Sequence, residues 1–271
     1  VEPGTVLIIM AVWRRLIKSQ LLSDILVQEI FGCMYQFLSV ISSLVQYHEN
    51  LKSTCPLSST SLLSSSELTL SMHDASRTVL ETLSDFVDLG KTLITPRMTL
   101  LCLNAGLTFK LTCPSDLETL YRLTNTLLIH HTNTALRAVP SIIHIANKLI
   151  SSCIELGHAD KLTEQPGLVK DVLRCAQLIT RLLTLLASPA YKTDLGKVAH
   201  SILATYVIGV QRGTLHTAVK KELVRGLNKV MSICDRFRLA ALSISLPAGV
   251  KDTFKVLHQD YEKYHRYSGF V

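Results

Sequence analysis

Four basic side chains with the spacing of one helix face are the first candidates for chemistry. They are Lys221, Arg225, Lys229 and Arg236, which follow one another at intervals of four, four and seven residues. On an α-helix this spacing places them along one side, where such side chains contact phosphate groups. A solvent-exposed helix face has the same pattern and is the alternative. No aromatic residue lies between these charges, so base stacking is not indicated there.

The excess of positive charge lies in the same third of the chain. The 271 residues carry a formal net charge of +7. Residues 211–271 hold eleven Lys or Arg and five Asp or Glu, a net of +6, which leaves +1 for the first 210 residues. A local excess of this kind attracts an acidic partner or nucleic acid. The sequence therefore predicts weak, mainly electrostatic RNA binding by residues 211–271.

An aromatic stripe near the C-terminus is the second candidate. Phe254, Leu257, Tyr261 and Tyr264 are spaced by three, four and three residues, which places them on one face of a helix. A docking helix that closes the fold competes here with a basic–aromatic nucleic-acid surface and with a binding tail. Most of the neighbouring Lys residues lie on other faces, which favours the docking helix. The partners predicted for it are Leu223, Leu227 and Val230.

The sequence contains none of the common catalytic motifs. The patterns GxSxG, GxxxxGK[ST], GxGxxG and HExxH are all absent. Acidic residues are thinly spread, without a carboxylate pair for acid–base chemistry. We therefore predict that the protein is not an enzyme, has no catalytic or cofactor-binding residues, and takes no small-molecule substrate.

Histidine and cysteine residues do not show metal-ligand spacing. Seven Cys occur, no two of them closer than eleven residues, so CxxC motifs are excluded. His130 and His131 would diverge by about 100° on a helix. Their rings are expected to bind buried backbone groups near the turn at 132–133 instead. We predict no metal site, and reduced Cys residues that pack as small apolar side chains.

Periodic apolar residues predict the helices that position these side chains. One apolar set occupies positions 168, 172, 175, 179, 182 and 186, and another occupies 215, 219, 223, 227, 230 and 234. No run alternates with period two for long enough to make a sheet. The predicted helices lie near residues 6–20, 22–47, 74–93, 97–111, 116–131, 134–156, 167–187, 194–211, 214–235 and 250–267.

Long helices joined by short turns predict an all-α fold. Predicted helix starts at 116, 167 and 214 are fifty-one and forty-seven residues apart, close to the roughly 40–47 residues of HEAT and armadillo repeats. We therefore predict an irregular HEAT/armadillo-like α-solenoid of stacked antiparallel helical hairpins. A compact helical bundle is the alternative.

The domain organisation follows from composition. Residues 1–112 are expected to form an N-terminal helical segment with a Ser-rich loop at 53–71, and residues 113–271 a C-terminal helical-repeat domain, both within one continuous solenoid. One short helix around residues 61–70 is the alternative to a loop throughout 53–71. The apolar run at residues 5–13 is nine residues long, about half of a membrane span. It is therefore expected to be buried, and no membrane partner is predicted.

Three stretches are distinctive enough to compare with known families: "LLIHH", "LGKVAHSILATYV" and the terminal "HQDYEKYHRYSG". With their surroundings from about residue 117 onward, they resemble the C-terminal domain of the family of unhealthy ribosome biogenesis protein two, also called nucleolar preribosomal-associated protein two. The resemblance covers about 150 of the 271 residues and is weaker over residues 1–110.

The resemblance implies a function that composition does not. Members of this family are long nucleolar helical-repeat proteins in early assembly of the large ribosomal subunit and pre-rRNA processing. It thus implies a non-enzymatic scaffold of the pre-ribosome, located in the nucleus and nucleolus, and a chain that is part of a longer protein, in keeping with Val1 as its first residue. The alternatives are a direct RNA-binding module using the basic C-terminal third and a general helical-repeat adaptor for protein–protein interaction. The implied partners are nucleolar preribosomal-associated protein one, a DEAD-box RNA helicase and pre-ribosomal RNA.

The family has no catalytic motif to carry over, and the matching positions are structural. They are His130, Gly196, His200, Tyr206, Gly226, Asp260 and Tyr261. One departure concerns residues 131–136, "HTNTAL", where many members carry a longer and more basic turn. If that turn contacts RNA in the family, the contact is not implied for this chain.

Overall fold

The computed structural model describes residues 62–89 and 94–265, together with isolated positions between 11 and 36. The apolar run at 5–13, the predicted helices near 6–20 and 22–47, and residues 53–61 lie wholly or mostly outside the described residues. The described part is all-helical, as predicted. Its only extended pairing is an isolated bridge between His158 and Leu215.

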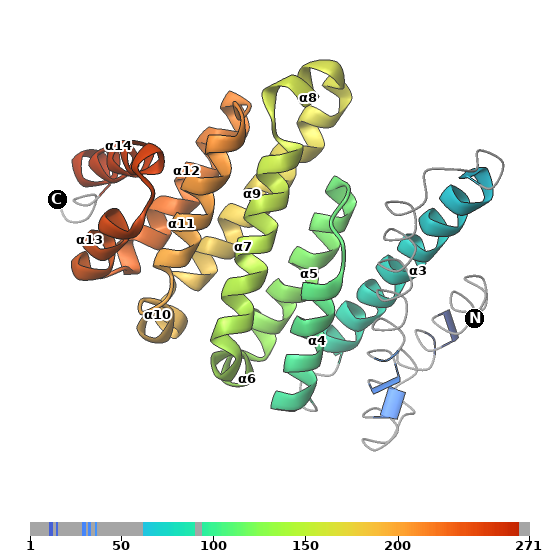
Figure 1. Ribbon diagram of the computed structural model, residues 1–271. Coiled ribbons are helices and arrows are strands. Elements are labelled where there is room, and N and C mark those ends of the chain that lie inside the picture. The colour runs from blue at the N-terminus through green and yellow to red at the C-terminus, as the bar shows by residue number, and fades with distance from the viewer. Residues whose placement is uncertain are drawn as a thin grey trace. The chain divides into compact units, whose positions relative to one another are not determined.

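The helices follow one another along the chain as labelled in Figure 1. They are α3 (Leu62–Leu89), α4 (Pro96–Thr108), α5 (Pro114–His130), α6 (Thr132–Ala135), α7 (Val139–Leu156), α8 (Ala159–Glu164), α9 (Val169–Leu186), α10 (Pro189–Leu195), α11 (His200–Gly209), α12 (Thr217–Ile233), α13 (Arg236–Ser245) and α14 (Ala248–Tyr264). Short 3₁₀ turns lie at η1 (Leu136–Ala138), η2 (Pro166–Leu168) and η3 (Val210–Arg212).

Contacts divide the chain into two compact units. The first comprises residues 1–110 and 122–138, and the second comprises residues 111–121 and 139–271. The division therefore falls within α5. The domain boundary expected between residues 112 and 113 stays a prediction. All of the candidate site residues belong to the second unit.

The Ser-rich segment is helical from Leu62, close to the short helix expected around residues 61–70, but this helix is much longer than expected. Helix α3 begins at Leu62, so residues 62–71 of the predicted loop 53–71 belong to a helix of 28 residues. Serine in a helix interior costs only about half a kcal/mol relative to alanine. The segment is continuous with residues 75–87, whose apolar side chains are buried. Packing of that later part stabilises the whole helix.

In the first unit, the adjacent histidines at the end of α5 have different roles. Nε2 of His131 donates a hydrogen bond to the buried carbonyl oxygen of Val87 (3.1 Å), because a carbonyl can only accept. This confirms the backbone role predicted for His131. The prediction is wrong for His130, whose Nε2 lies 3.4 Å from the carboxylate of Asp88 at the surface.

Helix α5 begins where the sequence predicts a start, but with a different cap. The carboxylate of Asp116 accepts hydrogen bonds from the backbone N–H groups of Thr112 (2.8 Å) and Cys113 (3.1 Å). Such bonds satisfy donors that a helix start leaves open. Ser115 and Glu118 have the sequence spacing of a capping box, but Glu118 instead pairs with Arg174 of α9 at 3.0 Å.

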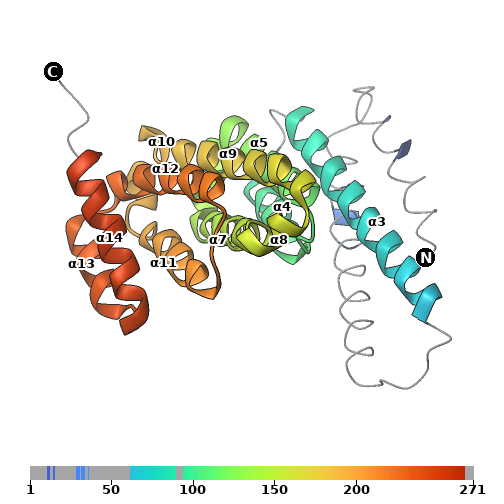
Figure 2. The same ribbon diagram turned by 90° about the horizontal axis from the view of Figure 1, so that it is seen from above.

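The centre of the second unit consists of two layers of helices, seen in Figure 2. Helices α9 and α12 lie side by side in one layer, and α7 and α11 in the other. The start of α12 lies near Gly157 at the end of α7, and the end of α12 lies near Gly196 at the end of α10. Helices within a layer therefore run parallel, whereas α7 and α9 are antiparallel, as are α11 and α12.

Glycines mark close approaches around α12, among them Gly226 and Gly196. A Cβ on Gly226 would lie 3.0 Å from Leu183 Cδ1 and 3.1 Å from Thr180 Cα. A Cβ on Gly196 would lie 2.8 Å from the carbonyl oxygen of Ile233. This contact accompanies a turn between α10 and α11, so the single helix predicted over 194–211 is wrong.

The second unit ends in the hairpin of α13 and α14. Helix α14 packs chiefly against α11 and α13, and Gln211 Nε2 donates to Thr253 Oγ1 at 2.7 Å. Helix α13 was not predicted. Its buried residues are only Leu239 and Leu242.

Candidate functional site

The four predicted phosphate-contacting residues do not share one helix. Lys221, Arg225 and Lys229 are exposed on α12, but Arg236 is the first residue of α13, after the turn at 234–235. The guanidinium of Arg225 pairs with Glu222 at 2.6 Å, which satisfies part of its charge locally. Phosphate contact by these residues stays a prediction.

The structure adds a second basic row that the sequence did not associate with the first. Lys170, Arg174 and Arg181 are exposed along α9. Each helix buries its opposite face, and α9 and α12 are joined through Thr180 Oγ1, which donates to the carbonyl oxygen of Glu222 at 2.8 Å. The two rows therefore lie on the outer surface of the layer formed by α9 and α12. The α9–α12 basic face consists of Lys170, Arg174, Arg181, Lys221, Arg225 and Lys229.

The aromatic stripe of α14 is buried at one end and exposed at the other. Phe254 and Leu257 are buried, Tyr261 is half-buried, and Tyr264 is 61% exposed. The Lys263 ammonium lies 4.9 Å from the centre of the Tyr264 ring, so charge and aromatic surface do meet at this end. The main neighbours of α14 are α11 and α13, rather than the α12 residues predicted as its partners.

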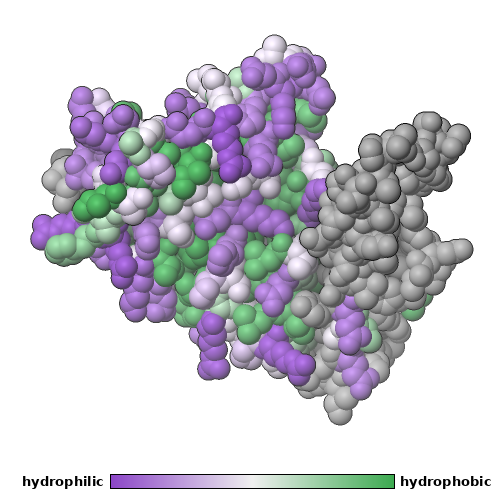
Figure 3. Space-filling model, viewed as in Figure 1, coloured by the Kyte–Doolittle hydropathy of each residue, from purple (hydrophilic) through white to green (hydrophobic). Residues whose placement is uncertain are grey.

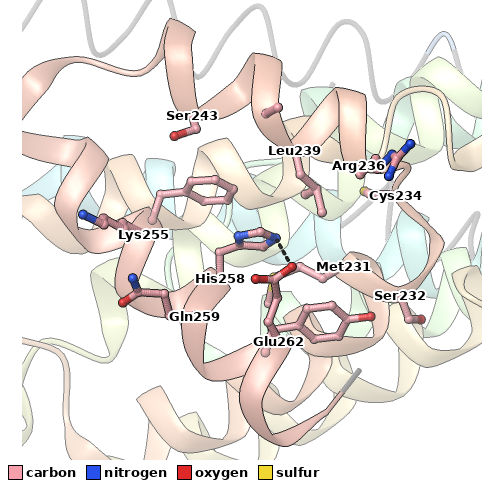
Figure 4. Close-up of a pocket in the computed structure, with 13 residues that line it drawn as sticks. Met231, Ser232, Cys234, Arg236, Leu239, Ser243, Lys255, His258, Gln259 and Glu262 are labelled. Atoms are coloured by element: carbon pink, nitrogen blue, oxygen red, sulfur yellow. Dashed lines mark ion pairs between the residues drawn. The ribbon is translucent and has the colours of Figure 1, made fainter. Parts of the chain in front are cut away.

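An open pocket of about 530 Å³ lies between the end of α12, α13 and α14 (Figure 4). Its floor includes Leu239 and Phe254, and its wall carries His258, whose ring stacks on Phe254 at 5.8 Å. His258 Nε2 lies 3.9 Å from Glu262 Oε1. Burial, and secondarily the nearby carboxylate of Asp235, raises the pKa of the Cys234 thiol to about 12. A thiol with that pKa is protonated at neutral pH and is a poor nucleophile.

Helix α13 also changes the environment of His200, at the start of α11. Burial and the positive charge of Arg238 lower the pKa of His200, and the carboxylate of Asp235 opposes this in part. Nδ1 of His200 is buried and has no hydrogen-bond partner among the described residues. The hairpin is thus coupled to a histidine that favours its neutral form.

The described residues show neither a metal centre nor a membrane-spanning helix. Within 62–89 and 94–265, no three His, Cys, Asp or Glu side chains are grouped so that they could hold a metal ion. In the same residues, no helix is both long and apolar enough to cross a bilayer.

Together, the described residues define an all-helical protein whose outer surface carries a basic face on α9 and α12 and exposed apolar side chains on α13. The chain belongs to the Urb2/Npa2 family, whose model matches residues 16–270. This is a family of ribosome biogenesis factors and is not known as an enzyme family. The match confirms the family that the sequence resembles and extends it toward the N-terminus. No solved structure matches the chain.

Several of the family's matching positions lie at helix contacts. Gly196 and Gly226 occupy the close approaches around α12. Tyr206 is buried in α11, where burial raises the pKa of its hydroxyl to about 12. Tyr261 is half-buried in the pocket wall of α14, and Asp260 is exposed. Most of these residues thus have a packing role.

Proposed function

We propose that the protein is a non-enzymatic helical scaffold in nucleolar assembly of the large ribosomal subunit and in pre-rRNA processing. The family match over residues 16–270 carries this proposal. An all-helical architecture with broad exposed helix faces supports it, because such faces can hold several partners at once. The proposed location is the nucleus, and within it the nucleolus.

We propose further that the fold is an irregular HEAT/armadillo-like solenoid. Support comes from the second unit, where the antiparallel pair of α7 and α9 is followed by the antiparallel pair of α11 and α12. The first helices of the two pairs, α7 and α11, pack on each other, and so do the second helices, α9 and α12. This is the arrangement that repeat stacking requires.

The proposed partners are nucleolar preribosomal-associated protein one and a DEAD-box RNA helicase, together with pre-ribosomal RNA. The test is affinity purification of the protein tagged at its own locus, with identification of the bound proteins and RNAs. We expect large-subunit assembly factors and pre-rRNA to be enriched over an untagged control. Purification without either class would contradict the scaffold proposal.

Direct RNA contact by the α9–α12 basic face is a second candidate function. Six exposed cations lie on two parallel, adjacent helices, which suits the backbone of a nucleic acid better than one row does. Two of the six are partly neutralised, Arg174 by Glu118 and Arg225 by Glu222. The remaining charges favour weak and salt-sensitive binding.

A matched pair of charge reversals tests RNA contact. The test variant changes Lys221, Arg225 and Lys229 to Glu, and the control changes Lys161, Lys192 and Lys197, which are exposed outside α9 and α12. Both variants lower the net charge equally. We expect the test variant alone to lose most of its affinity for single-stranded RNA, with the salt slope falling by about 2 if three phosphate contacts are lost. Equal losses in both variants would show that only total charge matters.

A further inference from the structure

Helix α13 exposes an apolar stripe along about two turns. Phe237 is 74% exposed and Ile244 is 77% exposed, and Ala240 and Ala241 are exposed between them. Spacings of four and three from Phe237 through Ala241 to Ile244 place these side chains on one helix face. We call these four residues the α13 stripe.

The stripe is a continuous feature and not a scatter of single apolar residues. Helix α13 buries only Leu239 and Leu242, so most of its apolar surface faces away from the rest of the second unit. Figure 3 shows hydrophobic residues interrupting the hydrophilic surface over α13 and α14. Isolated exposed apolar residues need no explanation, but a row along one helix marks an interaction site.

Positive charge borders the stripe on both sides. Arg236 and Arg238 flank Phe237, and Lys255 projects from α14 at the rim of the pocket. The Arg236 guanidinium lies 5.3 Å from the centre of the Phe237 ring. None of the three cations forms an ion pair with another described residue, and α13 itself contains no Asp or Glu. Two carboxylates lie nearby: Asp235 caps α13, and Glu262 lies beside His258 in the pocket. The three cations outnumber them, so the border is complementary to negative charge.

The pocket between α13 and α14 adjoins the stripe. Ala240 belongs to both, since it lines the pocket and lies on the exposed side of α13. Figure 4 shows Arg236 and Lys255 at the two ends of this opening, with His258 between them. A volume of about 530 Å³ has room for a large side chain of a bound helix.

We propose that the α13 stripe and the adjoining pocket bind an amphipathic helix of a partner protein whose apolar face is flanked by acidic residues. A helix in an apolar groove is anchored by apolar residues one turn apart, with aromatic and Arg residues as its strongest contacts. The charges at the border then select an acidic partner. This proposal deepens the scaffold function proposed above and rests on it.

Other occupants fit the surface less well. Two copies of this chain joined across α13 would bring Arg236 and Arg238 of both copies into the contact without any carboxylate on α13 to pair with them. RNA would leave the apolar surface of Phe237 and Ile244 without a matching partner, because its backbone is charged. An acidic amphipathic helix satisfies both properties of the surface.

Two synthetic helical peptides provide the probe. Both carry Leu at positions i, i+3, i+4 and i+7, and they differ only in having Glu or Lys beside this row, residues of similar helix propensity. Fluorescence anisotropy with the whole chain should show at least tenfold tighter binding of the Glu peptide. Phe237→Ser with Ile244→Ser should weaken that binding at least tenfold. A control with Ile129→Ser and Ile208→Ser, which are also exposed, should bind as the unchanged chain does.

A charge swap completes the test. Arg236→Glu with Arg238→Glu should reverse the preference, so that the Lys peptide binds more tightly. Equal binding of the two peptides, binding that survives Phe237→Ser and Ile244→Ser, or a dimer of the unchanged chain that these substitutions dissociate would each overturn the proposal. If the peptides fail to bind while large-subunit factors still co-purify, the proposed docking of an acidic helix is wrong and the scaffold function stands. If those factors do not co-purify but the Glu peptide binds with this selectivity, the scaffold function is wrong and the acidic-helix preference stands.

Discussion

Two surfaces of the second unit differ in what their helices leave exposed. On α9 and α12, wide apolar faces are buried and the outer surface is charged. On α13, a seam of two leucines is buried, and Phe237 and Ile244 remain outside. Helices α9 and α12 pack against neighbouring helices on one side and face solvent on the other, as expected of amphipathic helices. The second surface lacks a neighbour among the described residues.

The difference separates two kinds of contact. A basic helix face binds through charge alone, so its contacts weaken with salt and tolerate sequence changes in the ligand. An apolar stripe with charged borders requires a partner of matching shape and charge. A scaffold that holds RNA with one surface and a protein helix with the other would use both.

The largest expected effect contrasts the two ends of the aromatic stripe on α14. Phe254→Ala removes a ring that is 2% exposed, and should lower the free energy of unfolding by about 3–5 kcal/mol. Tyr264→Ala removes a ring that is 61% exposed, and should change it by no more than about 0.5 kcal/mol. Urea denaturation followed by circular dichroism measures both. Similar losses would mean that the whole stripe anchors the hairpin.

A smaller effect probes the layer that carries the basic face. Gly226→Ala places a methyl group 3.0–3.1 Å from Leu183 and Thr180, and such overpacking costs about 1–3 kcal/mol. The higher helix propensity of alanine offsets about 1 kcal/mol of this at both Gly226 and Gly249, so the difference between the two variants reports the overpacking. Gly249→Ala is the matched control, because a Cβ there would have no atom within 4 Å. It should be neutral or stabilise slightly, since alanine restricts the unfolded chain. Thermal denaturation should separate the two variants, and equal melting temperatures would contradict close packing of α9 on α12.

The smallest effect concerns pH and the contact between α11 and α13. The pKa of His200 is lowered in the folded state by burial and by Arg238. Below about pH 6.5 the unfolded chain therefore binds more protons at this site. The stability contributed by neutral His200 is therefore fully present above about pH 6.5, and it is lost as the pH falls below that value. His200→Gln should make the melting temperature fall less between pH 7 and 5.5 than in the unchanged chain. Parallel curves for the two proteins would show that His200 does not couple to the hairpin.

Strong periodicity made α9 and α12 predictable from the sequence to within three residues. Helix α13 was missed because Phe237, Leu239, Leu242 and Ile244 are distributed around much of its circumference, so no single face stands out. A helix that binds another protein has apolar residues on its exposed face as well as on its buried face. This weakens the hydrophobic periodicity from which a helix is predicted.

The candidate surfaces were predictable only in part. The row of Lys221, Arg225 and Lys229 was found from its spacing, but its alignment with Lys170 and Arg181 depends on α9 lying beside α12. That neighbour relation arises from tertiary packing, including the space that Gly226 leaves for Thr180. Both basic rows can be recognised in the sequence, but the sequence does not show that they lie next to each other in the fold.

The proposed role in large-subunit assembly is tested most directly by conditional depletion of the protein in cells, followed by measurement of ribosomal subunits on sucrose gradients. The account predicts a fall in free large subunits relative to small subunits, with accumulation of large-subunit rRNA precursors, and recovery when the protein is restored. An unchanged ratio of large to small subunits after depletion, or an equal loss of both, would contradict it.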